Sequence, residues 1–378
     1  MIYLDNNSTT KVDERVLKKM LPFFSEKYLN PHSQLTKHNR GLVKSIEKSR
    51  QEIAKLVGAN KEEIFFTSGA TEANNLAIKG LDYKVKRGKD HFISLNTEHK
   101  CVLEALKKME LNNAKVTILN VAKDGLVDLR LLKKNITKKT VLVSIMMANN
   151  ETGVIQPIEE ISKICKEKKV LLHTDAAQAV GKIDINVKKL NIDIMSISAH
   201  KFYGPKGIGA IYVNSQPRVR LNTLIDGGGQ EKRLRSGTLP APLCIGFGEA
   251  ARIARLEMKK EYKRTKLLRD YLVKEIKNKI KNIGINGHLE KRLPANINFF
   301  IRGIKSIDLI SKLNKTVISA GSACTSQSME PSYVLKGMGL DKEIIDASIR
   351  VGIGRFNTKK DIDIAIKELI TLVNKMRQ

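Results

Sequence analysis

The stretch Val141-Leu142-Val143-Ser144-Ile145-Met146 indicates the fold class. It is an apolar run without the polar alternation of a strand that has one wet face, so it predicts a strand buried on both faces. Similar short runs recur before and after it, with amphipathic helical patterns between them, which predicts an α/β protein with a mostly parallel sheet covered by helices. The other expected strands are Ile64–Thr67, His91–Leu95, Val116–Leu119, Val170–His173 and Ile194–Ser198, and the expected helices are Thr71–Lys79, Cys101–Met109 and Ile158–Lys168.

The pattern changes after about residue 250, where a smaller α+β part begins. A long basic amphipathic helix is expected over Ala250–Ile280, because Leu268, Leu272 and Ile276 recur every four residues on one stripe. A strand at Asn296–Ile301, a helix at Ser306–Leu313, a strand around Ile349 and a final helix from about Lys359 follow.

The length and composition limit the classes of protein to which this chain can belong. The chain has 378 residues, of which 42% are hydrophobic, enough for a large buried core. No run approaches the roughly 20 uncharged apolar residues of a membrane span, so no membrane association is expected. The four cysteines form no CxxC pair and no metal-ligand spacing, which argues against a disulfide framework and against a metal site. A cytoplasmic location is therefore expected, since the cytosol is reducing.

The formal net charge of +29 permits two interpretations. A nucleic-acid partner is one of them. The other is lysine scattered over every solvated face, and it is favoured because the basic residues run from Lys11 to Arg377 without an aromatic-interleaved patch or a recognition motif. Direct nucleic-acid binding is therefore not expected.

Three motifs suggest a site for a phosphorylated aromatic cofactor. In 67–72, Thr-Ser-Gly-Ala-Thr-Glu ends a strand and opens a helix, where backbone N–H groups and the Thr71 hydroxyl could hold a phosphate. Asp175 ends a buried strand, where a pyridinium N–H could keep it ionised, although it could also only cap the next helix. Lys201 ends another strand, where desolvation would lower its pKa and make it a usable amine nucleophile. Together these are the groups that pyridoxal phosphate requires.

One cysteine and one histidine stand out from the rest of their kind. Cys324 lies in the small polar stretch 318–326, which suits a loop that carries a reactive thiolate. The other cysteines, Cys101, Cys165 and Cys244, are expected in the core. His99 follows a strand end and could stack on a planar ring, whereas His173 lies inside a strand and is expected to be a hydrogen-bonded core residue.

The sequence resembles the cysteine desulfurases of the NifS/IscS type, within the class V aminotransferases of the pyridoxal phosphate fold type I. The resemblance covers nearly the whole length through many ordered motifs. They are Tyr3–Thr10, Thr67–Glu72, Thr97–Lys100, Asn149–Gly153, Asp175–Gln178, Ser198–Lys201, Gly227–Glu231, Arg235–Thr238 and Gly321–Cys324. It implies a large domain, 12–255, with a mostly parallel seven-stranded sheet, and a smaller α+β domain formed by 1–11 and 256–378 that carries the Cys324 loop.

The resemblance also implies roles for individual positions. Lys201 is the Schiff-base lysine, Asp175 pairs with the pyridinium nitrogen, Gln178 reaches the phenolic oxygen and His99 stacks on the ring. The phosphate is held by Ala70, Thr71, Ser198 and His200, with Thr238 reaching it from the other subunit of a homodimer, and Asn150 and Arg350 hold the substrate carboxylate. Arg350 is preferred to Arg355 for that role, although Gly352 replaces the serine that usually follows the arginine by two positions.

The implied activity is conversion of L-cysteine to L-alanine with a persulfide left on Cys324. The implied sulfur acceptor is an iron–sulfur scaffold protein, with tRNA-thiolation acceptors as a further option. An arrangement in which Cys324 shares a cluster ligand position with the scaffold is also among the implied options. The alternative is a selenocysteine lyase or another class V enzyme, although ordinary transamination would need no thiol.

Overall fold

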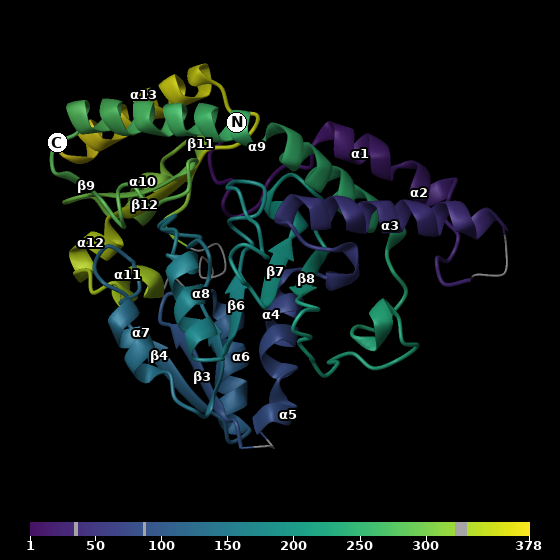
Figure 1. Cartoon of the computed structure of the whole chain (residues 1–378). Coiled ribbons are helices and arrows are strands. Elements are labelled where there is room, and N and C mark those ends of the chain that lie inside the picture. The colour runs from purple at the N-terminus through teal and green to yellow at the C-terminus, as the bar shows by residue number, and fades with distance from the viewer. Residues whose placement is uncertain (34–36, 86–87, 322–330) are drawn as a thin grey trace.

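A computed structural model describes residues 1–33, 37–85, 88–321 and 331–378 (Figure 1). Cys324, the expected sulfur acceptor, lies outside the described residues. Its role therefore stays a prediction from the sequence.

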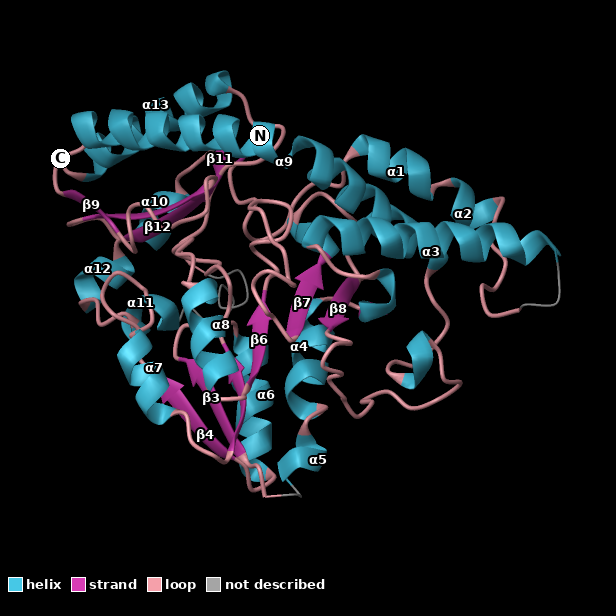
Figure 2. Ribbon diagram, in the orientation of Figure 1, coloured by secondary structure: helices cyan, strands magenta, loops and turns pink. Residues whose placement is uncertain are grey.

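A seven-stranded sheet forms the centre of the larger part, with strand order β2-β8-β7-β6-β5-β3-β4 (Figure 2, magenta). Strands β3, β4, β5, β6 and β7 pair with one another in parallel, whereas β8 pairs antiparallel with both β2 and β7. The prediction of a mostly parallel sheet is confirmed, and β8 is a strand that the sequence patterns did not reveal. The strands are β2 Ile64–Thr67, β3 His91–Leu95, β4 Lys115–Leu119, β5 Thr140–Ser144, β6 Leu171–Asp175, β7 Ile194–Ser198 and β8 Gly209–Val213.

Both faces of the central strands are buried, as the unalternated apolar runs predicted, but the same prediction was wrong for the edge strand β4, where Lys115 and Ile118 are exposed. Successive residues of one strand enter different cores: Leu142 packs in one hydrophobic cluster and Val143 in another. Ile194 and Met195 divide in the same way. Side chains of a strand point alternately to opposite faces, so each face of the sheet carries its own core.

Helices cover the sheet and fill the connections between its strands (Figure 1). The three helices expected between strands are confirmed, with ends that shift by one or two residues. The helices of this part are α1 Glu14–Met20, α2 Pro22–Ser25, α3 Lys37–Val57, α4 Ala70–Lys79, α5 Asp82–Val85, α6 Lys100–Leu111, α7 Leu129–Asn135 and α8 Ile158–Glu167. Single 3-10 turns occur at Lys61–Glu63, Ala199–Lys201 and Glu231–Arg233.

A smaller α+β part lies beside the large sheet and has its own core. Its three-stranded antiparallel sheet has the order β12-β10-β9, and β1 pairs in parallel with β11. The strands expected near residues 296–301 and 349 are thereby confirmed. Its elements are β1 Ile2–Tyr3, β9 Ile283–Ile285, β10 Asn296–Ile301, α10 Ser306–Ser311, β11 Thr316–Val317, α11 Tyr333–Gly337, α12 Lys342–Asp346, β12 Ser348–Gly352 and α13 Lys359–Met376.

Helix α9, Ala241–Lys279, runs along both parts and connects them (Figure 1). Its first half packs in the core of the large sheet, and Leu272 and Ile276 in its second half pack in the core of the smaller part. The expected start at Ala250 was wrong by nine residues. The expected domain boundary between residues 255 and 256 falls inside this helix, and the division into domains stays a prediction.

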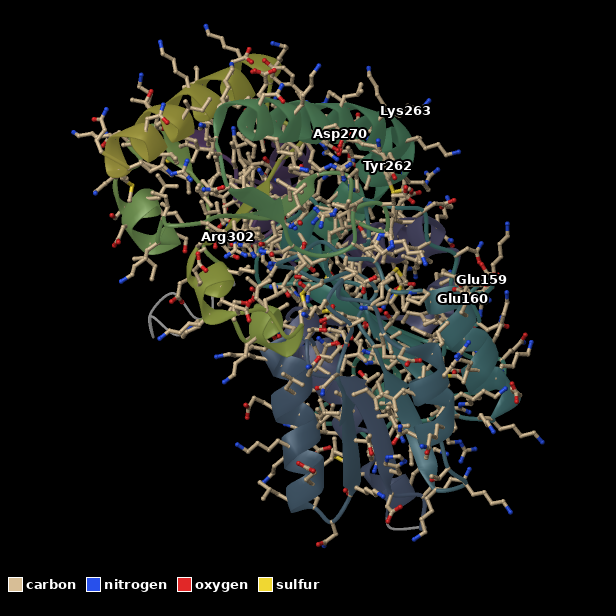
Figure 3. All side chains as sticks on the ribbon, turned by 90° about the vertical axis from the view of Figure 1, so that its left-hand side faces the viewer. Glu159, Glu160, Tyr262, Lys263, Asp270 and Arg302 are labelled. Carbon is tan, nitrogen blue, oxygen red and sulfur yellow. The ribbon has the colours of Figure 1, made fainter. Side chains whose placement is uncertain are left out.

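The charged side chains spread over the outside of the molecule. In Figure 3, nitrogen tips project all around the outline, with Lys263 on α9 as a labelled example. In the described part of the chain, no helix is long and apolar enough to cross a membrane.

Candidate active site

A pocket of about 410 Å³ opens at the carboxyl ends of β6 and β7, next to Arg350 of β12. This is where ligands bind in parallel α/β sheets. The pocket brings together ten of the expected site residues from segments far apart in the sequence. They are Ala70, Thr71, His99, Asn150, Asp175, Gln178, Ser198, His200, Lys201 and Arg350.

The amino-terminal end of α4 forms one wall of the pocket. Helix α4 begins at Ala70, so its first backbone N–H groups and its positive dipole end point at the wall that Thr71 also lines. The turn before it packs closely on β8: a Cβ at Gly209 would lie 2.7 Å from the Cα of Gly69, so residue 209 must be glycine. This close approach holds the helix end at the pocket.

Two polar residues face this helix end from β7 and the turn after it. Ser198 is buried, and the Nδ1 of His200 lies 2.9 Å from the Oγ1 of Thr9. Burial, together with the smaller effect of nearby lysines, of which Lys201 acts most strongly, lowers the pKa of His200 to about 4. The imidazole is therefore neutral at pH 7, and the wall offers hydrogen-bond donors suited to a phosphate.

Asp175 occupies the end of β6 with both carboxylate oxygens held by neutral donors. Its Oδ2 accepts from the Nδ2 of Asn74 at 2.7 Å, and its Oδ1 accepts from the backbone N–H of Ala177 at 2.9 Å. No lysine or arginine forms an ion pair with Asp175 within the ranges that the structure describes. A buried carboxylate without a cation in the protein is suited to a protonated ring nitrogen.

Lys201 ends the 3-10 turn that follows β7, and its amine reaches into the pocket. The Nζ donates to the backbone carbonyl of Asn7 at 2.9 Å and to that of Ser8 at 2.6 Å. These carbonyls belong to the amino-terminal segment, which crosses the pocket before α1. Two backbone acceptors therefore hold the amine in the pocket.

His99 is the N-cap of α6, and this fixes its tautomer. The backbone N–H of Cys101 donates to the Nδ1 at 3.3 Å, and a backbone N–H can only donate. The neutral ring therefore carries its proton on Nε2. The prediction that Cys101 lies in the core is partly wrong. Cys101 lines the pocket, and its Sγ lies 3.0 Å from the Nδ1 of His99.

Gln178 connects the pocket to the residues behind it. Its Nε2 donates to the carbonyl of Asn7 at 2.9 Å. Its Oε1 accepts from the Nδ2 of Asn7 at 3.2 Å and from the Nζ of Lys182 at 2.9 Å. The amide is therefore oriented with its oxygen toward these two donors.

Arg350 lies at the other end of the pocket, almost fully buried in β12. Its Nη2 donates to the Asp5 carboxylate at 2.6 Å and to the Ser8 hydroxyl at 2.5 Å, and its Nη1 donates to the Asn150 carbonyl at 3.1 Å. The other candidate, Arg355, lies away from the pocket and pairs with Asp13 at 2.7 Å. The geometry therefore favours Arg350 as the carboxylate ligand.

Two expected site residues are not brought into this pocket. Thr238 is exposed and does not line it, and Cys324 lies outside the described residues. Sequence reasoning also missed contributors, because nothing in the local patterns marks them. Those residues are Asp5, Asn7, Ser8, Asn74 and Lys182.

The remaining predictions about histidine and cysteine are confirmed. His173 is fully buried, with its two ring nitrogens 2.8 Å from the Ser144 hydroxyl and 3.0 Å from the Ser196 hydroxyl. Cys165 and Cys244 are buried, and burial raises the pKa of Cys165 to about 12. Among the described residues, no group of three His, Cys, Asp or Glu side chains could hold a metal ion.

The pocket fits pyridoxal phosphate on the chemistry of its side chains. The α4 end could hold a phosphate, the buried Asp175 carboxylate could pair with a protonated ring nitrogen, and the Lys201 amine reaches into the same pocket. Asp175, Gln178, His99 and Lys201 all line this pocket and could hold the cofactor ring. The fold and the pocket together define a pyridoxal phosphate-dependent enzyme.

Comparisons with known proteins agree with this class. The aminotransferase class-V family model matches residues 2–364, and the chain belongs to this family. Two curated relatives named cysteine desulfurase IscS, from Rickettsia bellii and Ehrlichia chaffeensis, are each 49% identical to it. Each alignment covers 100% of this chain and 92% of the relative.

Solved structures confirm the expected fold type. A NifS-like protein has a TM-score of 0.92 and 37% identity, and the match covers 99% of both chains. A structure titled as SspA in complex with cysteine has a TM-score of 0.83 and 35% identity, covering 95% of this chain and 100% of that chain.

Proposed function

We propose that this protein is a cysteine desulfurase that converts L-cysteine to L-alanine and leaves the sulfur as a persulfide on Cys324. The observation that carries the proposal is that Lys201, Asp175 and Arg350 line one pocket. Relatives that are 49% identical over the whole chain carry the name cysteine desulfurase, and one similar structure is titled as a complex with cysteine.

The cofactor-facing residues have separate tasks. Pyridoxal phosphate, when bound, supplies an electron sink for negative charge at the substrate α-carbon. Asp175 keeps the ring nitrogen protonated, Gln178 donates to the phenolic oxygen, and His99 lies against the ring. Ala70, Thr71, Ser198 and His200 hold the phosphate.

The substrate-facing residues bind the amino acid and move its protons. Arg350 and Asn150 hold the substrate carboxylate, and the Lys201 amine accepts the α-proton. The Cys324 thiolate then attacks the substrate sulfur: an S–S bond forms, the bond from sulfur to Cβ breaks, and its electron pair stays with carbon. Protonation of that carbon, with return of a proton from the Lys201 amine to the α-carbon, gives alanine.

Assembly and delivery are further parts of the proposal. Thr238 reaches the phosphate of the partner subunit in a homodimer, which agrees with its exposure away from the pocket of its own subunit. The persulfide passes to an iron–sulfur scaffold protein, or to an acceptor for tRNA thiolation, in the cytoplasm.

The test combines a spectrum with product analysis. Purified protein with pyridoxal phosphate should show a visible absorbance band that Lys201→Ala abolishes. Cys324→Ala should retain the band but lose alanine formation and the mass increase of one sulfur, whereas the buried control Cys165→Ala should retain all three. A colourless protein, or full alanine formation by Cys324→Ala, would overturn the proposal; release of selenide but not of sulfide would identify a selenocysteine lyase.

A further inference from the structure

Lys182 is a buried cationic side chain behind the pocket to which the proposed reaction gives no task. It lies four residues after Gln178 in the loop that follows β6, and its Nζ donates to the Oε1 of Gln178 at 2.9 Å. The described residues place no carboxylate in an ion pair with it. A buried lysine bound to a neutral amide costs stability, and such groups concentrate at functional sites.

Lys182 lies beside a small cavity, and the nearby Glu261 carboxylate does not neutralise it. Lys182 lines a cavity of about 30 Å³ together with Tyr203, Glu261 and Tyr262. Glu261 does not neutralise it, because that carboxylate is hydrogen-bonded to Arg355. The side chain as a whole is half-buried, but its amine is enclosed by the protein.

The charges that act on Lys182 come from the pocket side. Burial, together with the smaller effect of the positive charges of Lys201 and Arg350, lowers the pKa of Lys182 to about 7. The influence extends to His200, whose pKa is lowered in part by Lys182. Lys182 therefore changes its charge close to neutral pH, within electrostatic reach of the amine that must react.

We propose that Lys182 is a positioning residue of the cofactor site, which holds the oxygen of the Gln178 amide and brings a positive charge near Lys201 and Arg350. The inference rests on the proposed roles of Lys201 and Gln178. An amide held by its oxygen presents its Nε2 hydrogens as donors, one of which already goes to Asn7. A positive charge nearby favours the neutral form of the Lys201 linkage to the cofactor.

The first experiment separates charge from shape. Lys182→Arg keeps the positive charge, Lys182→Met removes it, and Lys189→Met removes an exposed charge from the same connection as a control. The pH midpoint of the visible cofactor band is measured for each purified holoenzyme, with thermal unfolding to verify folding. The midpoint of Lys182→Met should lie about 1 unit above that of Lys182→Arg, and Lys189→Met should match the wild type.

A double-mutant cycle tests the contact with Gln178. Lys182→Met should weaken binding of pyridoxal phosphate about 5- to 10-fold in the wild-type background, and less than about 2-fold beside Gln178→Met. Folded Lys182 variants that share one midpoint and lose affinity equally in both backgrounds would overturn the inference. A wild-type protein without a visible band would instead overturn the proposed function, so the two failures are distinguishable.

Discussion

The Arg350 guanidinium donates to the Asp5 carboxylate at 2.6 Å, although 345 residues separate the two in sequence. The pair holds the arginine in one orientation at the end of the pocket, since Ser8 and Asn150 accept from the same guanidinium. A carboxylate substrate therefore meets an arginine whose position is already fixed, which lowers the entropic cost of binding.

Asp5→Asn should weaken the fixation of Arg350. Removal of one partner leaves a buried charge uncompensated, so the free energy of unfolding should fall by about 3 kcal/mol. The KM for cysteine should rise about tenfold with a smaller change in kcat, measured by alanine formation. The exposed Asp308→Asn should change neither quantity; a KM for Asp5→Asn at or below the wild-type value would contradict the positioning role.

Glu98→Gln should be tolerated, because burial favours the neutral form of the Glu98 carboxyl in the folded protein. Burial raises its pKa well above the ordinary value, and the charge of Asp175 adds to the rise. The unfolded chain loses this proton above about pH 4.5 while the folded chain keeps it, so the wild type loses stability as pH rises.

The Glu98→Gln variant lacks this loss of folding stability at higher pH. Its free energy of unfolding should equal the wild-type value near pH 4 and exceed it at pH 8, by about 1.4 kcal/mol for each unit by which the pKa is raised. Chemical denaturation at both pH values measures this, with the exposed Glu104→Gln on helix α6, which follows Glu98, as control. Equal pH dependence in wild type and Glu98→Gln would show an ionised carboxylate.

His173 should contribute to acid unfolding. Burial lowers its pKa to about 3, whereas the unfolded chain takes up this proton near pH 6.5. The contribution of the neutral ring is therefore complete above pH 6.5 and is lost as pH falls toward 3, by a total of about 3–5 kcal/mol.

His173→Gln should be less stable at pH 7, because Ser144 and Ser196 lose their ring partner. Its unfolding free energy should change less between pH 6.5 and 4 than that of the wild type. The exposed His32→Gln serves as control, and an unchanged slope in His173→Gln would place the acid sensitivity elsewhere.

The buried pair of Arg50 and Glu231 should hold the segment that leads to Thr238. Both Glu231 oxygens accept from the guanidinium at 2.7 Å, and the backbone N–H of Phe66 donates to the same carboxylate at 2.6 Å. The residues Glu231–Arg233 have φ angles of 46°, 55° and 68°, which are strained for side chains other than glycine.

Glu231→Gln should therefore lower the free energy of unfolding by about 3 kcal/mol and weaken subunit association. Glu343→Gln is the matched control, because it breaks the exposed pair with Arg302 (labelled in Figure 3) and should cost less than about 1 kcal/mol. Calorimetry and sedimentation measure the two effects, and equal losses in both variants would contradict a structural role of the buried pair.

The sequence patterns correctly predicted those helices and strands whose conformation and burial are determined by residues close together in the sequence. The ends of β2, β3 and β7 coincide with the expected strands, because apolar runs with two buried faces are visible locally. The start of α9 was wrong because Gly246 and Gly248 resemble helix breakers. A Cβ at Gly248 would lie 2.3 Å from the Cβ of Ser49, so that glycine permits two helices to pack closely.

The residues of the site also fall into those that the local sequence pattern predicts and those that it does not. Asp175 ends β6 and Lys201 ends the turn after β7, and the local pattern reveals both positions, although it predicted Lys201 at the strand end itself. Asp5 and Lys182 acquire a task only through contacts with residues that the fold brings near. A carboxylate in the first ten residues carries no local sign of an arginine at position 350. The spacing of residues in the sequence does not predict tertiary contacts of this kind.

The pocket takes its walls from both ends of the polypeptide, with Asn7 and Ser8 on one side and Arg350 on the other. Translation proceeds from the amino terminus, so Arg350 is synthesised last of these three residues, 342 positions after Ser8. A nascent chain therefore has no complete pocket until its synthesis is nearly finished. Premature termination just before Arg350 should release polypeptides that carry every strand of the large sheet but lack the arginine at the end of the pocket.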